Sequence, residues 1–124
     1  KTNTITWDPT MGVLTNEGHL LSPTTVLNHE IDHALQQDQN PEQKKIDKAT
    51  KDPDYKNAEE KRVITGSEQK TAKKLGEIKE GQVTRKDHGG TPIETKGPTS
   101  TEPKMGVTIT APASKSSKTD EKKP

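Results

Sequence analysis

The sequence contains no cysteine and no phenylalanine, and one tryptophan and one tyrosine are the aromatic residues among its 124 positions. The lack of cysteine excludes disulfides and thiol chemistry. A net charge of +1 and the scarcity of stacking side chains argue against a nucleic-acid-binding surface. No apolar run approaches the length of a membrane span. We therefore expect neither a nucleic-acid partner nor a transmembrane segment.

Hydrophobic residues are also scarce, at 23% of the chain against 31% charged residues. Of the 22 large apolar residues, 11 lie before residue 36. The length is enough for one domain, but this composition can build only a small core. We expect that core to be anchored in the first third of the chain.

The two ends carry different signals. The chain begins with Lys1 and has no signal-peptide pattern, and we expect it to be a fragment of a longer protein. The last 28 residues contain four prolines and nine serines or threonines. Such a segment buries too little surface to offset its ordering entropy. We therefore predict a folded domain over residues 1–96 and a disordered tail over 97–124.

The clearest predicted element is a helix over residues 23–39. Ser22 is a good N-cap, Pro23 suits the first helical position, and Pro41 stops the pattern. The apolar residues Leu27, Ile31, Ala34 and Leu35 share one face of this helix. We expect that face to point into the protein, with the two histidines beside it.

The other predicted elements are shorter. Alternation in 4–7 and the apolar pair at 13–14 predict an N-terminal β-hairpin. The polar stretch 40–57 is interpreted as a long loop that can hold a helical turn near Ile46, and Asn57-Ala58-Glu59-Glu60 as the capping box of a second helix that Gly66 interrupts. A third helix near 68–79 and a strand or ordered loop within 83–93 complete a fold of the α+β class.

His29-Glu30-Ile31-Asp32-His33 fits the pattern HExxH. Residues four apart lie on one side of a helix, so both imidazoles can reach a single zinc ion. Zinc lowers the pKa of a bound water to about 7, and Glu30 can then act as the general base for attack on a carbonyl. The pattern predicts a zinc-dependent metallopeptidase.

A catalytic zinc usually has a third protein ligand. Gln36 and Gln39 occupy the positions that an extended motif with a third histidine would fill with Gly and His, so that class is excluded. A carboxylate on a following helix is the other common solution. Glu60 is the favoured ligand, and Glu59 is the alternative.

Peptidases of this type also supply a hydrogen-bond donor to the developing oxyanion. Four residues are candidates for this role, and the sequence does not choose among them: Tyr55, Arg62, Arg85 and His88.

Five segments together resemble the zincin toxin domains at the C-terminal ends of bacterial Rhs-repeat polymorphic toxins: Thr4–Pro9, Leu21–Pro23, Leu27–Ala34, Ala58–Glu68 and Lys74–Glu77. The arrangement is also similar to effector-type zinc peptidases. These enzymes are usually larger than this chain, which leaves less surface for a substrate cleft.

The resemblance implies a small zincin-like domain with His29 and His33 as zinc ligands, Glu30 as the catalytic base and an acidic ligand from the Glu59–Glu60 pair. It further implies a secreted protein, delivered into a target cell as part of a larger bacterial protein, which hydrolyses peptide bonds of a target-cell protein. A cognate immunity protein is the implied partner. Two alternatives remain: a catalytically weak zinc-binding module that acts by protein–protein interaction, and a mostly disordered linker.

Overall fold

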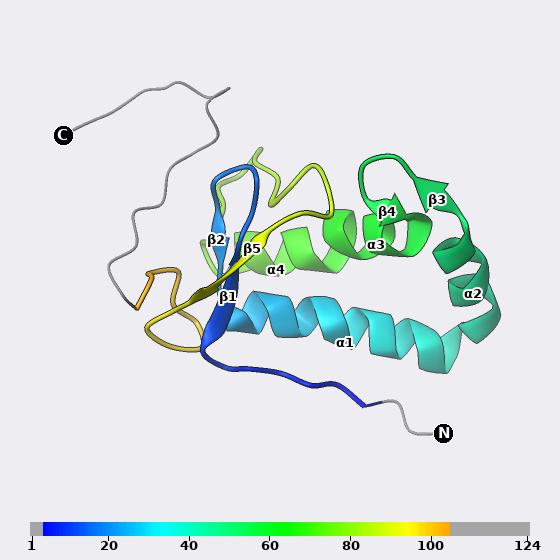
Figure 1. The fold of residues 1–124 in the computed structure, drawn as a ribbon, viewed down its shortest axis with the longest axis horizontal. Coiled ribbons are helices and arrows are strands. Elements are labelled where there is room, and N and C mark those ends of the chain that lie inside the picture. Colours follow the sequence, from blue (N-terminus) through cyan, green and yellow to red (C-terminus); the bar gives the residue numbers. More distant parts are fainter. Residues whose placement is uncertain (1–3, 105–124) are drawn as a thin grey trace.

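A computed structural model describes residues 4–104 (Figure 1). Its elements along the chain are β1 (Met11–Leu14), β2 (Leu20–Leu21), α1 (Pro23–Gln39), α2 (Pro41–Ala49), β3 (Lys51–Asp52), β4 (Lys56–Asn57), α3 (Ala58–Val63), the π-helix η1 (Ile64–Glu68), α4 (Gln69–Lys74) and β5 (Thr91–Glu94). Figure 1 shows α1 packed beside the continuous helical segment α3–η1–α4, with a small sheet at one end. The α+β class is therefore confirmed.

The larger sheet has the antiparallel order β2-β1-β5, with Val13 opposite Leu21 and Gly12 opposite Ile93. The predicted N-terminal hairpin is confirmed, but it is formed by β1 and β2, and residues 4–7 are not a strand. Instead, the indole Nε1 of Trp7 donates to the carbonyl oxygen of Pro23 at 2.9 Å, which ties this stretch to the start of α1.

Helix α1 spans the predicted residues. The Ser22 hydroxyl accepts a hydrogen bond from the Thr25 amide at 3.3 Å, as an N-cap does. Glu77 adds a second cap, because its carboxylate accepts from the Ser22 amide at 3.1 Å and from the Thr25 hydroxyl at 2.7 Å. Pro41 ends α1 and also begins α2. The predicted loop over 40–57 therefore contains a full helix around Ile46, where the sequence indicated no more than a single helical turn.

The segment α3–η1–α4 begins as predicted, with the Asn57 side chain accepting from the Glu60 amide at 2.9 Å. Gly66 does not interrupt it, because the chain continues through the π-helix η1. A π-helical turn holds one more residue than an α-helical turn. Eight α-helical steps would turn Glu68 about 80° away from Glu60, and the extra residue reduces this angle to about 20°. Both carboxylates therefore face α1.

The apolar core is small. Leu21, Ala72 and Ile78 form its buried cluster. More of the buried residues are polar or charged, and these are Thr15, Ser22, Thr25, His29, Glu59, Glu68, Thr84, Arg85 and Thr95. Buried polar groups stabilise a fold only when they are paired. The interior therefore depends on its hydrogen bonds and ion pairs as well as on apolar contact.

The apolar face of α1 does not point inward, which corrects the sequence prediction. Leu27, Ile31 and Ala34 are half-buried, and Leu35 is 49% exposed, whereas His29 on the other side is 5% exposed. His29 lies about 200° around the helix from Leu27. Because α3–η1–α4 packs on the histidine side, where its carboxylates pair with the imidazoles, the apolar stripe must turn outward.

Residues 97–104 lie against the domain, which differs from the predicted tail boundary at residue 97. The Thr24 amide donates to the carbonyl oxygen of Pro98 at 2.9 Å, and the Lys104 amide donates to Glu94 at 2.9 Å. The remainder of the predicted tail, 105–124, lies outside the described residues. None of the helices in residues 4–104 has the length and apolarity to span a bilayer.

Candidate metal centre

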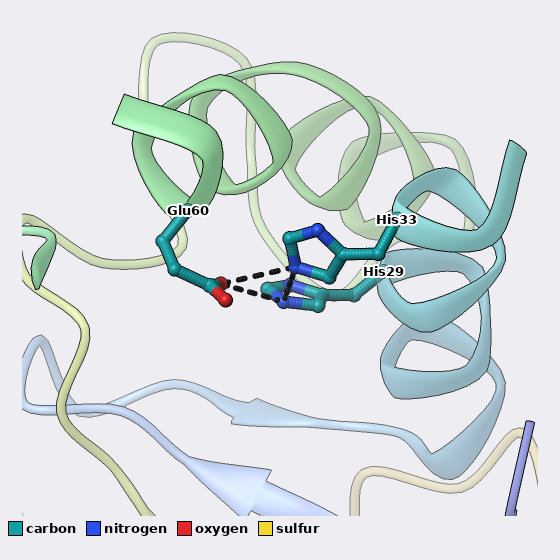
Figure 2. A group of neighbouring side chains, drawn as sticks. All are labelled: His29, His33 and Glu60. Atoms are coloured by element: carbon teal, nitrogen blue, oxygen red, sulfur yellow. Dashed lines mark hydrogen bonds and ion pairs between the residues drawn. The ribbon is translucent and has the colours of Figure 1, made fainter. Parts of the chain in front are cut away.

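Two histidines of α1 and one glutamate of α3 point at one another (Figure 2). The Nε2 atoms of His29 and His33 are 3.1 Å apart, and Glu60 Oε1 lies 3.2 Å from the first and 3.1 Å from the second. A tetrahedral zinc site with bonds of 2.0–2.1 Å has ligand atoms about 3.3 Å apart. The three atoms therefore form one face of a tetrahedron of suitable size, and the group could hold a metal ion.

The donor set itself supports this interpretation. Two imidazole nitrogens that face each other at 3.1 Å beside a carboxylate require a proton or a cation among them. His29 is buried, and the Nδ1 atoms of both rings are already engaged elsewhere. The Nε2 atoms are thus the free donors, and the set of two nitrogens and one oxygen suits zinc or a similar divalent transition metal.

His29 is held from behind by a buried carboxylate. Its Nδ1 lies 2.8 Å from Glu68 Oε1. Glu68 in turn accepts from the Thr84 hydroxyl at 2.7 Å and from Arg85, whose Nε and Nη2 lie 3.0 Å and 2.6 Å from its two oxygens. A carboxylate on Nδ1 fixes the tautomer and the ring orientation, which leaves Nε2 free to bind a metal.

His33 is held in the same way by Glu59. The distance from His33 Nδ1 to Glu59 Oε2 is 2.8 Å, and Arg62 donates to both Glu59 oxygens at 3.1 Å and 2.9 Å. Arg62 also pairs with Asp32 at 2.9 Å. Glu59, the alternative metal ligand in the sequence prediction, therefore supports a ligand from behind, and Glu60 is the residue that joins the group.

The carboxylates also shift the protonation equilibria. Burial of His29 opposes its protonation, but the hydrogen bonds that the protonated ring donates to Glu60 and Glu68 outweigh burial and raise its pKa to about 9. Burial likewise opposes protonation of His33, and Glu60 and Glu59 raise its pKa. The pKa of Glu60 is lowered despite its burial, because both histidines hydrogen-bond to it. Without a metal, the group is held together by protons on the imidazoles.

Glu30 follows His29 directly in α1 and is exposed. It does not belong to the group of converging ligand atoms, which consists of His29, His33 and Glu60 in the described part of the chain. Its carboxylate is accessible to solvent and lies outside the ligand set.

Of the four candidate oxyanion donors, His88 is the one placed against a ligand residue. Its Nε2 lies 3.5 Å from Glu60 Oε1, and its side chain is 41% exposed. Arg62 and Arg85 are occupied by Glu59 and Glu68. The Tyr55 hydroxyl donates to the Arg85 carbonyl at 3.4 Å. His88 therefore borders the group from its exposed side.

Sequence reasoning did not single out Glu68 or Thr84, which hold His29 from behind. Glu68 lies eight positions after Glu60, and an uninterrupted α-helix would not place both on one face. A sequence signal that could have pointed to Glu68 is Gly66, a glycine within the helix at which the π-helical turn forms.

Comparison of the chain with protein-family models, with curated proteins and with solved structures finds no match. The class of protein is therefore defined by the fold and the site alone. It is an α+β protein in which His29, His33 and Glu60 form a group that could hold a metal ion.

Proposed function

We propose that the protein is a zinc-dependent metallopeptidase that hydrolyses peptide bonds of a target-cell protein. The observation that carries this proposal is the convergence of His29 Nε2, His33 Nε2 and Glu60 Oε1 within 4.8 Å of one another. A buried carboxylate behind each histidine strengthens it. Three protein ligands are the usual number at a catalytic zinc, whereas structural sites have four.

In this proposal, His29, His33 and Glu60 would hold zinc, which would supply Lewis acidity and make water more acidic at the site. Glu68 and Glu59 keep the two imidazoles in the tautomer that presents Nε2. Glu30 takes the proton of the attacking water and delivers it to the leaving amine, so that one water molecule is consumed for each peptide bond cleaved.

The biological setting is proposed from the resemblance to toxin domains of Rhs-repeat proteins. The domain would be delivered into a target cell as part of a larger bacterial protein, and a cognate immunity protein would protect the producer. The site geometry supports the hydrolase chemistry, and the setting rests on the resemblance.

The decisive experiment replaces Glu30 with Gln and measures zinc content and cleavage together. Wild-type protein and Glu30→Gln are loaded with zinc and incubated with a proteome-derived peptide library, and new termini are identified by mass spectrometry. We expect full zinc content in both and a loss of cleavage of about 10²–10⁴-fold in the variant, since general base catalysis contributes that much. Glu42→Gln, an exposed change on α2, is the matched control. Undiminished cleavage by Glu30→Gln would refute the assignment.

A zinc-binding module without activity is the second candidate. The outward apolar face of α1, with Leu35 49% exposed, favours it because such a stripe can contact another protein. In the same experiment, this candidate predicts zinc binding by the wild-type protein and no cleavage at all.

A further inference from the structure

Two chains of interactions support the group of His29, His33 and Glu60. Each runs from an arginine through a glutamate to one of the two histidines, but the two arginines differ in their surroundings. Arg62 binds Glu59, which holds His33, and Arg85 binds Glu68, which holds His29. The two arginines differ in exposure, since the side chain of Arg62 is 34% exposed and that of Arg85 is 10% exposed. They also differ in what lies on the other side of the guanidinium.

Arg85 continues into the loop that carries His88. Its Nη1 donates to the carbonyl oxygens of His88 at 3.3 Å and Gly89 at 3.1 Å, while Nε and Nη2 are committed to Glu68. A guanidinium presents its five N–H groups in a rigid fork. A shift of the Glu68 carboxylate is therefore passed to the two loop carbonyls.

The loop Asp87–Gly90 has a small number of other contacts, one of which joins it directly to the site, because His88 Nε2 lies 3.5 Å from Glu60 Oε1. The His88 amide donates to the Asp54 carbonyl at 3.1 Å, and the Gly89 amide donates to Asp87 Oδ1 at 2.9 Å. Asn16 Nδ2 donates to Asp87 Oδ2 at 3.1 Å. A Cβ atom on Gly90 would lie 2.6 Å from Val13 Cγ1, so the loop rests closely on the tip of β1.

We propose that Arg85 is a positioning residue that couples metal binding at His29 to the order of the loop Asp87–Gly90, and thereby sets His88 at the edge of the site. The inference rests on the metal-binding part of the proposed function. A metal ion held by His29, His33 and Glu60 would fix the position of the His29 ring, and with it the Glu68 carboxylate that the ring's Nδ1 contacts at 2.8 Å. Glu68 then holds Arg85, and Arg85 holds the loop. Because coupling between two sites is reciprocal, a more ordered loop also raises metal affinity.

The first test follows amide hydrogen exchange at His88 and Gly89 with and without Zn²⁺. In the wild-type protein, zinc should slow this exchange by about 5–150-fold, the usual range of a coupling between sites. Arg85→Lys keeps a positive charge for Glu68 but cannot bridge to the loop carbonyls, so zinc should protect the two amides far less, by only as much as the direct contact between His88 and Glu60 supplies. Arg62→Lys is the matched control. It weakens zinc binding through Glu59, but it should leave zinc-dependent loop protection intact.

The second test runs the coupling in reverse. Asn16→Ala removes the hydrogen bond between the β1–β2 turn and the Asp87 side chain at an exposed position. It leaves both arginine chains whole, so it remains informative if Arg85→Lys does not fold. Its affinity for Zn²⁺, measured by competition with a chromophoric chelator, should fall below that of the wild type. Unchanged affinity in Asn16→Ala, or full loop protection in folded Arg85→Lys, would overturn the inference. A wild-type protein that binds no zinc would refute the proposed function itself.

Discussion

The two neighbouring glutamates of α3 can be compared directly, because the same change from Glu to Gln affects a proposed metal ligand at one position and the support of a ligand at the other. Glu60→Gln removes the charge from the oxygen that lies 3.2 Å and 3.1 Å from the two imidazole nitrogens. Glu59→Gln alters a support that touches His33 only through Nδ1. We therefore expect both variants to bind zinc more weakly than the wild type, and we expect Glu60→Gln to have the lower zinc affinity of the two.

The magnitudes follow from these positions. Loss of a carboxylate behind a ligand costs about 10–100-fold in metal affinity, or about 1.4–2.7 kcal/mol, and this is the expectation for Glu59→Gln. Glu60→Gln replaces one of three ligands by a neutral amide oxygen, so its loss should exceed 100-fold, or more than about 2.7 kcal/mol. The variants also differ at Arg62. Glu59→Gln removes one of the two carboxylates that pair with this arginine and leaves Asp32 as its partner, whereas Glu60→Gln does not affect it.

Zinc affinity is measured by chelator competition at pH 7.5, and the absorption spectrum of the Co²⁺-loaded protein reports the ligand set. Glu59→Gln should retain the wild-type Co²⁺ spectrum at saturation, whereas Glu60→Gln should change it. Far-ultraviolet circular dichroism establishes that both variants are folded, and Glu42→Gln is the control. If Glu59→Gln lost more affinity than Glu60→Gln, the ligand and its neighbour would have exchanged roles and the geometric reasoning would be wrong.

Four further predictions concern proton release, pH-dependent stability, helix capping and the C-terminal segment. Zinc binding at pH 7.5 should release protons, since the pKa of His29 is raised to about 9 and that of His33 is also raised. Calorimetry in buffers of different ionisation enthalpy measures the number of protons released, and a heat of binding that does not depend on the buffer would contradict the prediction. The same raised pKa stabilises the metal-free fold below about pH 6.5, and this contribution should be lost as pH rises through about 9, as urea unfolding of the chelated protein would reveal. Glu77→Gln weakens the second cap of α1 and should cost about 1–3 kcal/mol of unfolding free energy, and an unchanged urea midpoint would count against it. Truncation after Lys96 should lower the melting temperature more than truncation after Lys104, because residues 97–104 hydrogen-bond to Thr24 and Glu94; equal melting temperatures would show that those bonds contribute nothing.

The parts of the fold that the sequence predicted are those with local chemical signals. The cap at Ser22, the stop at Pro41 and the cap at Asn57 define the bounds of α1 and the start of α3, and the four-residue spacing brings His29 and His33 together. These features depend on residues a few positions apart.

The predictions that were wrong concern contacts between distant segments. The apolar stripe of Leu27 and Leu35 was assigned to the core because apolar faces usually are buried, but the pairing of Glu59, Glu60 and Glu68 with the opposite face decided the orientation. That pairing depends on the π-helical turn at 64–68, which brings onto one face two residues that eight steps of an ordinary α-helix would separate.

The dispersed origin of the metal-binding group has a thermodynamic consequence. Glu60 lies 27 positions after His33 and Glu68 lies 39 positions after His29, so the complete group exists only in the folded chain. Closing a loop of that length costs about 3 kcal/mol beyond a constant. Metal binding therefore stabilises the folded state, and any loss of folding stability lowers the apparent metal affinity. A weaker apparent zinc affinity identifies a ligand only when the unfolding free energy of the metal-free variant is known to be unchanged.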